Sequence, residues 1–446
     1  RNLIMNNPLA KDFTFSSLLH FAFPTIVMML FMGLYTIVDT IFVSQFVNTF
    51  ALSALNIVCP VINIIVGIGT MIATGGSAII ARQMGAGKMT EAHQNFTIIF
   101  VLTILLGLII TLVGLFFIEN IIWGLGASPL LFPYCKDYLL IIFIFTPASL
   151  LQVLFQSLIV TAGKPKYGFF LSISAGMINI ILDYVFIVVF DMGIMGAALG
   201  TGFGYMVPAV FGIFFFTNHK GTLSLTTPSF KPMVFIECCT NGSSEMVSQV
   251  ATAITTFFFN QAMMTLLGES GVAAMTIMIY TQFLFTTLYI GFSMGVAPII
   301  SFQYGAQNYK SLKKIYKICL TFIGISSLCI FLASLFSRSQ LIQLFTSSDT
   351  YVYQIAYSGF TIFLFHFLFI GMNIFTSATF TALSNGKVSA FISFLRTFGF
   401  IMIGLLFLPT YFGVTAVWLT VPIAECLTSL ISLLLIFIYR KQYHYL

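Results

Sequence analysis

Residues 17–45 read SLLHFAFPTIVMMLFMGLYTIVDTIFVSQ, and Asp39 is the only Asp, Glu, Lys or Arg in this stretch. A helix needs about 20 largely apolar residues to cross roughly 30 Å of hydrocarbon, so this stretch is long enough to span a membrane. A carboxyl group inside such a span is costly and is usually retained for a function. The rest of the chain repeats this apolar pattern.

The whole chain has the composition of a membrane protein. Its 446 residues are 59% hydrophobic and 7% charged, against roughly 25% charged residues in ordinary soluble domains. This composition excludes a water-soluble enzyme, a nucleic-acid binder and a disordered chain, because each of them needs more charge. The seven cysteines are scattered and show no metal-binding spacing, so we expect no cofactor.

Lys, Arg, Gly and Pro interrupt the apolar sequence and divide it into twelve candidate spans. We therefore expect an all-α integral membrane fold. The expected transmembrane helices lie near 17–45, 51–81, 94–118, 136–160, 169–190, 194–216, 235–265, 272–303, 315–336, 353–383, 389–408 and 414–439.

Basic residues alternate between the connections, which indicates the orientation of the chain, because cytoplasmic loops carry an excess of Lys and Arg. Only Lys136 and Arg338 fall outside, and Arg396 falls within a span. Both termini are therefore expected in the cytoplasm, in a multi-pass protein of the cell (inner) membrane. The residues assigned to the cytoplasmic side are Arg1, Lys11, Arg82, Lys88, Lys164, Lys166, Lys220, Lys231, Lys310, Lys313, Lys314, Lys317, Lys387, Arg440 and Lys441.

The two halves of the chain resemble each other when the sequence is shifted by 220 positions; for example, residues 51–57 align with 271–277, and Gly85 aligns with Gly305. Because each half has an even number of spans, two six-helix lobes related by a pseudo-two-fold axis along the membrane normal are expected. Rocking of the lobes would expose the cleft between them to each side in turn. The expected divisions are a tail at 1–16, an amino-terminal lobe at 17–216, a linker at 217–234, a carboxy-terminal lobe at 235–439 and a tail at 440–446.

Two acids inside the spans are expected to lie at the same depth. Asp39 and Asp183 each precede the outer end of a span by six or seven residues, which is about 10 Å along a helix. Tyr35 and Asn179 each lie four residues earlier, on the same helix faces as the acids. The sixth span brings Ala197 and Thr201 to that depth as well.

A group of carboxylates, an amide, a hydroxyl and a carbonyl has two possible uses. Hard cations such as Na⁺ prefer oxygen ligands. Alternatively, two acids held close in a low dielectric do not both stay ionised, so one of them can carry a proton. Either use couples an ion gradient to a conformational change, and the residues leave both open.

The chain resembles the multidrug and toxic compound extrusion (MATE) transporters along essentially its whole length. The resemblance is carried by several motifs in order: Pro24, Tyr35 and 38–40 (VDT), 51–54 (ALSA), 75–78 (GGSA) with Gly85, 163–165 (GKP), and Asn179-x-x-x-Asp183. It is closest to the bacterial and archaeal branch whose first-helix and fifth-helix aspartates form a cation or proton site in the amino-terminal lobe.

The resemblance implies export of cationic, aromatic or amphipathic compounds in exchange for inward Na⁺ or H⁺. Asp39 and Asp183 would then be the ion-binding carboxylates, supported by Asn179 and Thr201. Ala197 would offer a carbonyl oxygen, and Tyr35 would hydrogen-bond to the first-helix acid. We also expect a kink near Pro24 that changes with the protonation of Asp39, since proline leaves a carbonyl unbonded in a helix.

Further residues are candidates for substrate contact. Glu245 matches the position of an acid used widely in the family, and its alternative role is an ion pair with Arg396. Where another branch carries an aspartate in the tenth helix, this chain has Asn373, so a second ion site in the carboxy-terminal lobe is not expected. The remaining polar candidates for the cleft are Asn63, Gln152, Asn260 and Gln282.

Two other functions remain as alternatives to drug export. A flippase for a lipid-linked precursor would need basic residues in the cleft to bind a diphosphate, and Arg396 is the only one within a span. A polytopic membrane enzyme would need a catalytic set, which the five scattered histidines do not provide. The expected partners are small organic molecules and membrane lipid, with no nucleic acid, and the protein is expected to be a monomer.

Overall fold

The computed structural model describes residues 2–218 and 221–446, and these residues form helices joined by short connections. Arg1 and Lys220, both assigned to the cytoplasmic side by their charge, lie outside the described residues. The long helices are α2 (Phe15–Phe46), α3 (Thr49–Gly85), α4 (Met89–Phe116), α8 (Pro165–Asp183), α9 (Ile194–Asn218), α11 (Ser243–Leu267), α12 (Glu269–Gly305), α13 (Tyr309–Phe336) and α19 (Val414–Tyr443).

The shorter helices complete or connect these spans. They are α1 (Asn2–Met5), α5 (Ile118–Gly124), α6 (Phe132–Ile144), α7 (Thr146–Thr161), α10 (Pro232–Asn241), α14 (Arg338–Gln343), α15 (Tyr351–Phe363), α16 (Phe367–Ala382), α17 (Gly386–Phe394) and α18 (Phe400–Phe412). Two 3-10 helices, η1 (Pro8–Ala10) and η3 (Leu364–His366), and two π-helices, η2 (Tyr184–Val189) and η4 (Leu395–Gly399), add single turns.

The predicted membrane fold is confirmed. Among the described residues, eleven helices are long and apolar enough to cross a membrane, and the number is twelve if α6 and α7, bent by 55°, count as one span. That bent pair covers the fourth predicted span, 136–160. Its bend coincides with Pro147 near the start of α7, where the missing N–H of proline suits a new helix start.

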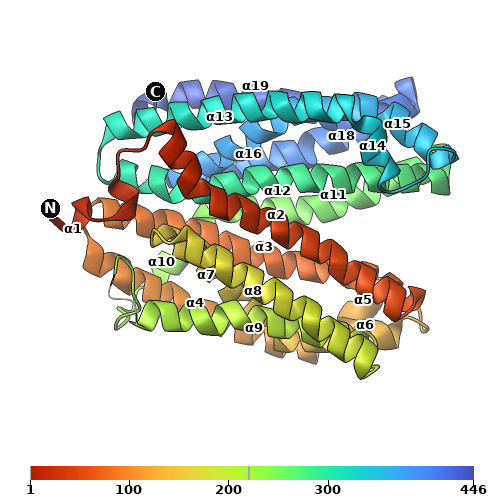
Figure 1. Cartoon of the computed structure of the whole chain (residues 1–446), viewed down its shortest axis with the longest axis horizontal. Coiled ribbons are helices and arrows are strands. Elements are labelled where there is room, and N and C mark those ends of the chain that lie inside the picture. The colour runs from red at the N-terminus through yellow and green to blue at the C-terminus, as the bar shows by residue number, and fades with distance from the viewer. Residues whose placement is uncertain (1, 219–220) are drawn as a thin grey trace.

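The helices form two groups that lie side by side, α2–α9 and α11–α19, and we call these the amino-terminal half and the carboxy-terminal half (Figure 1). Helices α2 and α12 pack against each other where the groups meet, and α2 also packs on α8 of its own group. Both chain ends lie at the same end of the bundle, which we call the terminus end (Figure 1).

Glycines bring the two halves into main-chain contact near the terminus end. A Cβ atom on Gly85 of α3 would lie 2.0 Å from the carbonyl oxygen of Phe302, and one on Gly305 of α12 would lie 2.0 Å from that of Arg82. A similar approach joins α3 to α10, where a Cβ on Gly75 would lie 1.9 Å from the carbonyl oxygen of Cys238. Only glycine permits these distances, so the contacts depend on the missing side chains.

The amino-terminal tail packs against the ends of distant helices. Leu9 and Phe13 are fully buried, and Gln303 Nε2 of α12 donates a 3.0 Å hydrogen bond to the carbonyl oxygen of Leu9. Asp12 pairs with Lys314 of α13 at 3.0 Å. The tail is held because burying its apolar side chains between helix ends is favourable.

Candidate functional site

The site predicted around Asp39 and Asp183 is assembled from α2 and α8. Asp183 is the last residue of α8, directly before the π-helix η2, and its side chain is fully buried. The carboxyl groups of Asp39 and Asp183 come within interaction distance of each other. The shared depth expected from the sequence therefore corresponds to real proximity. A π-helical turn is itself frequent at functional sites.

The oxygens of these acids lack donors. Among the described residues, no hydrogen-bond partner reaches Asp39 Oδ1 or either carboxylate oxygen of Asp183. A buried anion without a donor or a positive neighbour is strongly unfavourable. The pair is therefore stable only when a proton or a cation neutralises part of its charge.

Helix α9 closes the site through glycines. A Cβ on Gly200 would lie 2.2 Å from Asp183 Oδ1, and one on Gly204 would lie 3.2 Å from the Cβ of Asn179. The close approach of α9 to α8 thus places its backbone against both polar residues. Our sequence analysis did not single out these glycines, although their four-residue spacing is the small-residue pattern of close helix pairs.

Two more predicted ligands contribute unpaired oxygens. Asn179 Oδ1 and Thr201 Oγ1 are buried and have no hydrogen-bond partner among the described residues. Ala197 is also buried, one turn before Gly200 on α9. Asn179 lies one turn before Asp183 on α8, and Thr201 follows Gly200, which lies against Asp183. Carboxylate, amide and hydroxyl oxygens of this kind suit a hard cation or a proton.

Tyrosines surround the acid pair. The charges of Asp39 and Asp183 act on the phenol groups of Tyr35, predicted from its spacing, and of Tyr138, which was not predicted. The charge of Asp39 also acts on Tyr205 of α9. A phenol O–H is a group that can donate to a carboxylate.

The carboxy-terminal half holds its buried acid differently. Arg396 Nη1, in the π-helix η4, lies 3.3 Å from Glu425 Oε1 of α19. Asn373 Nδ2 of α16 donates to Glu425 Oε2 at 2.7 Å and to the Glu425 carbonyl oxygen at 2.9 Å. Arg396 therefore pairs with Glu425 and not with Glu245, which was the alternative considered for Glu245.

Glu245 lies in the first turn of α11 and is partly buried. The charge of Arg396 reaches it, but no ion pair of Glu245 within 4 Å occurs in the described part of the chain. Its carboxylate thus remains available to a positively charged ligand.

The other predicted cleft residues are not gathered into one cavity. Gln152 is buried, Asn63, Asn260 and Gln282 are partly buried, and Asn260 Oδ1 has no hydrogen-bond partner in the described chain. Pro24 is buried inside α2, which remains one helix over Phe15–Phe46. The contacts of these residues do not assign them to a substrate.

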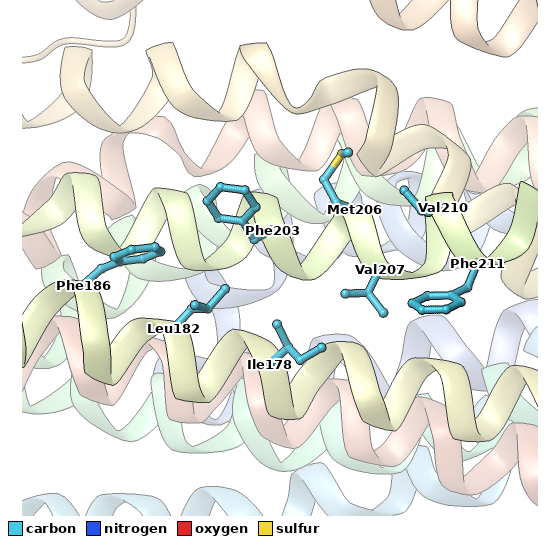
Figure 2. A pocket seen from close by; sticks show the side chains of 8 residues that line it. All are labelled: Ile178, Leu182, Phe186, Phe203, Met206, Val207, Val210 and Phe211. Atoms are coloured by element: carbon cyan, nitrogen blue, oxygen red, sulfur yellow. The ribbon is translucent and has the colours of Figure 1, made fainter.

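Two cavities are lined by residues other than the acid pair. One, of about 490 Å³, is an apolar groove between α8 and α9 (Figure 2), and its lining includes Ile178, Leu182, Phe186 and Phe203. The other, of about 320 Å³, lies among Asn48, Tyr134, Asp137 and Asp191. Neither contains a predicted site residue, so we locate the function from the acids and not from cavity size.

Comparison with known proteins gives consistent matches. The MatE family model matches twice, at residues 24–185 and 246–407. The multidrug export protein MepA of Staphylococcus haemolyticus is 25% identical over 96% of this chain and 94% of its own length. MepA of Staphylococcus saprophyticus is 22% identical over 97% of this chain and 95% of its own length.

Solved structures share the fold at low sequence identity. An outward-facing multidrug resistance MATE family transporter has a TM-score of 0.89 at 21% identity, covering 99% of this chain and 98% of that chain. A variant of the Vibrio cholerae MATE transporter VcmN has a TM-score of 0.89 at 21% identity and covers both chains fully.

Proposed function

Because the chain belongs to the MatE family, whose model matches both of its halves, we propose that it is a secondary-active multidrug exporter. It moves cationic or amphipathic organic compounds out of the cell in exchange for inward H⁺ or Na⁺. The relatives named above are multidrug export proteins that align with it over nearly their full length, which supports this assignment.

The observation that carries the proposal is the pair formed by the partly buried Asp39 and the fully buried Asp183. Asp39 Oδ1 and both carboxylate oxygens of Asp183 lack a donor among the described residues. Two carboxyl groups in a low dielectric need a proton or a cation between them. When the ion leaves, the site carries an unfavourable negative charge. The protein therefore has a reason to change conformation with the occupancy of the site.

Alternating access follows from the two-half architecture. Ion binding at α2, α8 and α9 changes the charge of the amino-terminal half, and α2 also packs against α12 of the other half. Pro24 removes a backbone hydrogen bond within α2, so this helix can bend there. A bend in α2 would alter the packing between the two halves. The terminus end is cytoplasmic in this scheme, as the basic residues indicate.

Glu245 is the proposed contact for positively charged compounds. Its carboxylate has no ion pair in the described chain, whereas the buried Arg396 is paired with Glu425. This pairing also argues against a precursor flippase, because the one basic side chain within a predicted span is already engaged by an acid.

The test is transport in proteoliposomes loaded with a fluorescent organic cation. An imposed H⁺ gradient and an imposed Na⁺ gradient are applied separately, and dye movement is followed over time. We expect one gradient to drive transport and the variant Asp39→Asn to abolish that dependence. Equal transport after both gradients are collapsed would contradict the proposal.

A further inference from the structure

The two halves of the protein hold their buried carboxyl groups in opposite electrostatic settings. In the amino-terminal half, Asp39 and Asp183 have no positively charged neighbour within ion-pair distance among the described residues. In the carboxy-terminal half, Glu425 has Arg396 at 3.3 Å. The acids of the amino-terminal half therefore need a proton or a cation from solution, whereas the carboxy-terminal half supplies the positive charge of Arg396.

The two settings are built on different positions of the repeat. A shift of 220 positions aligns Glu425 with Tyr205 and Arg396 with Gly176. Tyr205 lies near enough to Asp39 to be influenced by its charge. Gly176 lies against α2, where its Cβ would be 2.5 Å from the ring of Phe31. By the same shift Asp183 aligns with Ile403 and Asp39 with Phe259, so the Glu425 cluster occupies other positions of the repeat than the two acids.

Each half has a π-helix next to or containing a charged residue, although the two π-helices do not align under the shift of 220 positions. The helix that carries Asp183 continues into the π-helix η2, and the helix that carries Arg396 contains the π-helix η4. In the first case the π-turn follows an acid, and in the second it contains the arginine. A wide turn in each half thus presents a charged side chain to the inside of its helix group.

We propose that the guanidinium group of Arg396 is a permanent internal counter-ion for Glu425, so that this carboxylate needs no exchanged ion, unlike the acids of the other half. This inference rests on the proposed ion exchange. It assigns all ion exchange to Asp39 and Asp183 and leaves the carboxy-terminal half with a fixed charge balance throughout the cycle.

Burial and hydrogen bonds stabilise the ion pair of Arg396 and Glu425. Arg396 is 14% exposed and Glu425 is 2% exposed, so neither exchanges readily with water. Ser429 and Ser432 donate to Asn373 Oδ1 at 3.0 and 3.3 Å, which leaves the Asn373 amide nitrogen directed at Glu425. An arginine in a protein does not release its proton, so Arg396 keeps its positive charge at every working pH.

Two other ionisable groups lie within the electrostatic range of Arg396. The charge of Arg396 also reaches Glu245 and the buried His366. His366 Nδ1 contacts the carbonyl oxygen of Phe363 at 2.5 Å, and its Nε2 has no partner in the described chain. A neutral imidazole adds no second counter-ion, so Glu425 depends on Arg396 alone for positive charge.

The test uses dicyclohexylcarbodiimide, an apolar reagent that modifies protonated carboxyl groups in membrane proteins, with mass spectrometry of the peptides. In the purified wild-type protein at neutral pH, we expect modification of Asp39 or Asp183 and none of Glu425. In Arg396→Leu, we expect Glu425 to become protonated and modified. In Arg396→Lys, which keeps the charge, we expect Glu425 to stay unmodified.

Two results would overturn the inference: modification of Glu425 in the wild-type protein, or an unmodified Glu425 in Arg396→Leu when Asp183 in the same sample is modified. If Arg396→Leu does not fold, the double variant Arg396→Leu/Glu425→Leu decides, since it removes both charges together. It should keep the wild-type gradient dependence of dye transport, and loss of that dependence would also overturn the inference. The proposed function fails separately, if wild-type transport ignores both gradients.

Discussion

Gly200 of α9 lies directly against the carboxylate of Asp183 of α8, so closely that a Cβ at position 200 would be 2.2 Å from Oδ1. The shape of the ion site is thus set by a residue without a side chain. A carboxylate that is fully buried and pressed against a helix backbone has little freedom to adopt another rotamer.

A valine at position 200 should displace the carboxylate of Asp183. We expect Gly200→Val to lower gradient-driven dye transport by about tenfold to a hundredfold, because displacements of about 1 Å at a reacting group have effects of this size. The measurement is initial transport rate in proteoliposomes at equal protein content. Gly324→Ala on α13 is the control, since no atom lies within 4 Å of its added Cβ, and an equal loss there would contradict the explanation.

Neutralising the acids one at a time should separate their roles. Asp39→Asn should abolish drug resistance in cells while leaving the protein folded in the membrane. Asp183→Asn should change the dependence of transport on pH or on Na⁺, because the amide cannot exchange a proton. Normal resistance with Asp39→Asn would remove Asp39 from the ion site. An unchanged ion dependence with Asp183→Asn would leave Asp183 a structural role only.

Removing only one member of the Arg396 and Glu425 pair should destabilise the protein. Arg396→Ala leaves a buried carboxylate without its positive partner, which costs about 3–5 kcal/mol. Thermal unfolding of the detergent-purified protein measures this loss as a lower midpoint. The double variant Arg396→Leu/Glu425→Leu should recover most of the stability, and a double variant as unstable as the single one would show that packing matters more than charge.

Glu245 should matter more for positively charged compounds than for neutral ones. Glu245→Gln keeps the size of the side chain and removes its charge. We expect transport of an organic cation to fall more than transport of a neutral amphipathic compound of similar size. Competition assays with the two compounds on the same vesicles give the comparison, and equal losses would count against a direct contact with the cation.

A methyl group at position 305 should force the two halves apart at the terminus end. The added Cβ of Gly305→Ala would lie 2.0 Å from the carbonyl oxygen of Arg82, so one of the helices must move. Cys238 is fully buried beside α3 and donates to the carbonyl oxygen of Ile72 at 3.0 Å. We expect its thiol to react faster with an alkylating reagent in this variant, and a rate like that of Gly324→Ala would contradict the opening.

The sequence predicted those features of the structure that follow from position along the chain alone. Apolar length predicts the spans, and the residue count from each span end places Asp39 and Asp183 at one depth. Which face of a helix meets its neighbour depends on rotation and tilt, which a depth count does not contain. For that reason Arg396 was considered as a partner for Glu245, about 5 Å away in depth, whereas the structure pairs it with Glu425 of α19.

Close packing was also difficult to predict. The burial of Leu9 and Phe13 depends on a surface formed by distant helix ends, including Gln303. The role of Gly200 depends on which helix lies opposite it. The burial of the tail and the contact of Gly200 both depend on residues that are far apart in the chain and close in the fold. A single sequence does not directly indicate which distant residues will be in contact.

The main-chain contact of Gly85 with Phe302, and of Gly305 with Arg82, has a consequence for energy conservation. Where backbone atoms touch, no file of water fits between them. In the proposed exporter, such a contact would keep hydronium or sodium ions from leaking along this part of the interface. Because the contact is made by the absence of side chains, rocking of the two halves alone would break it and form it again.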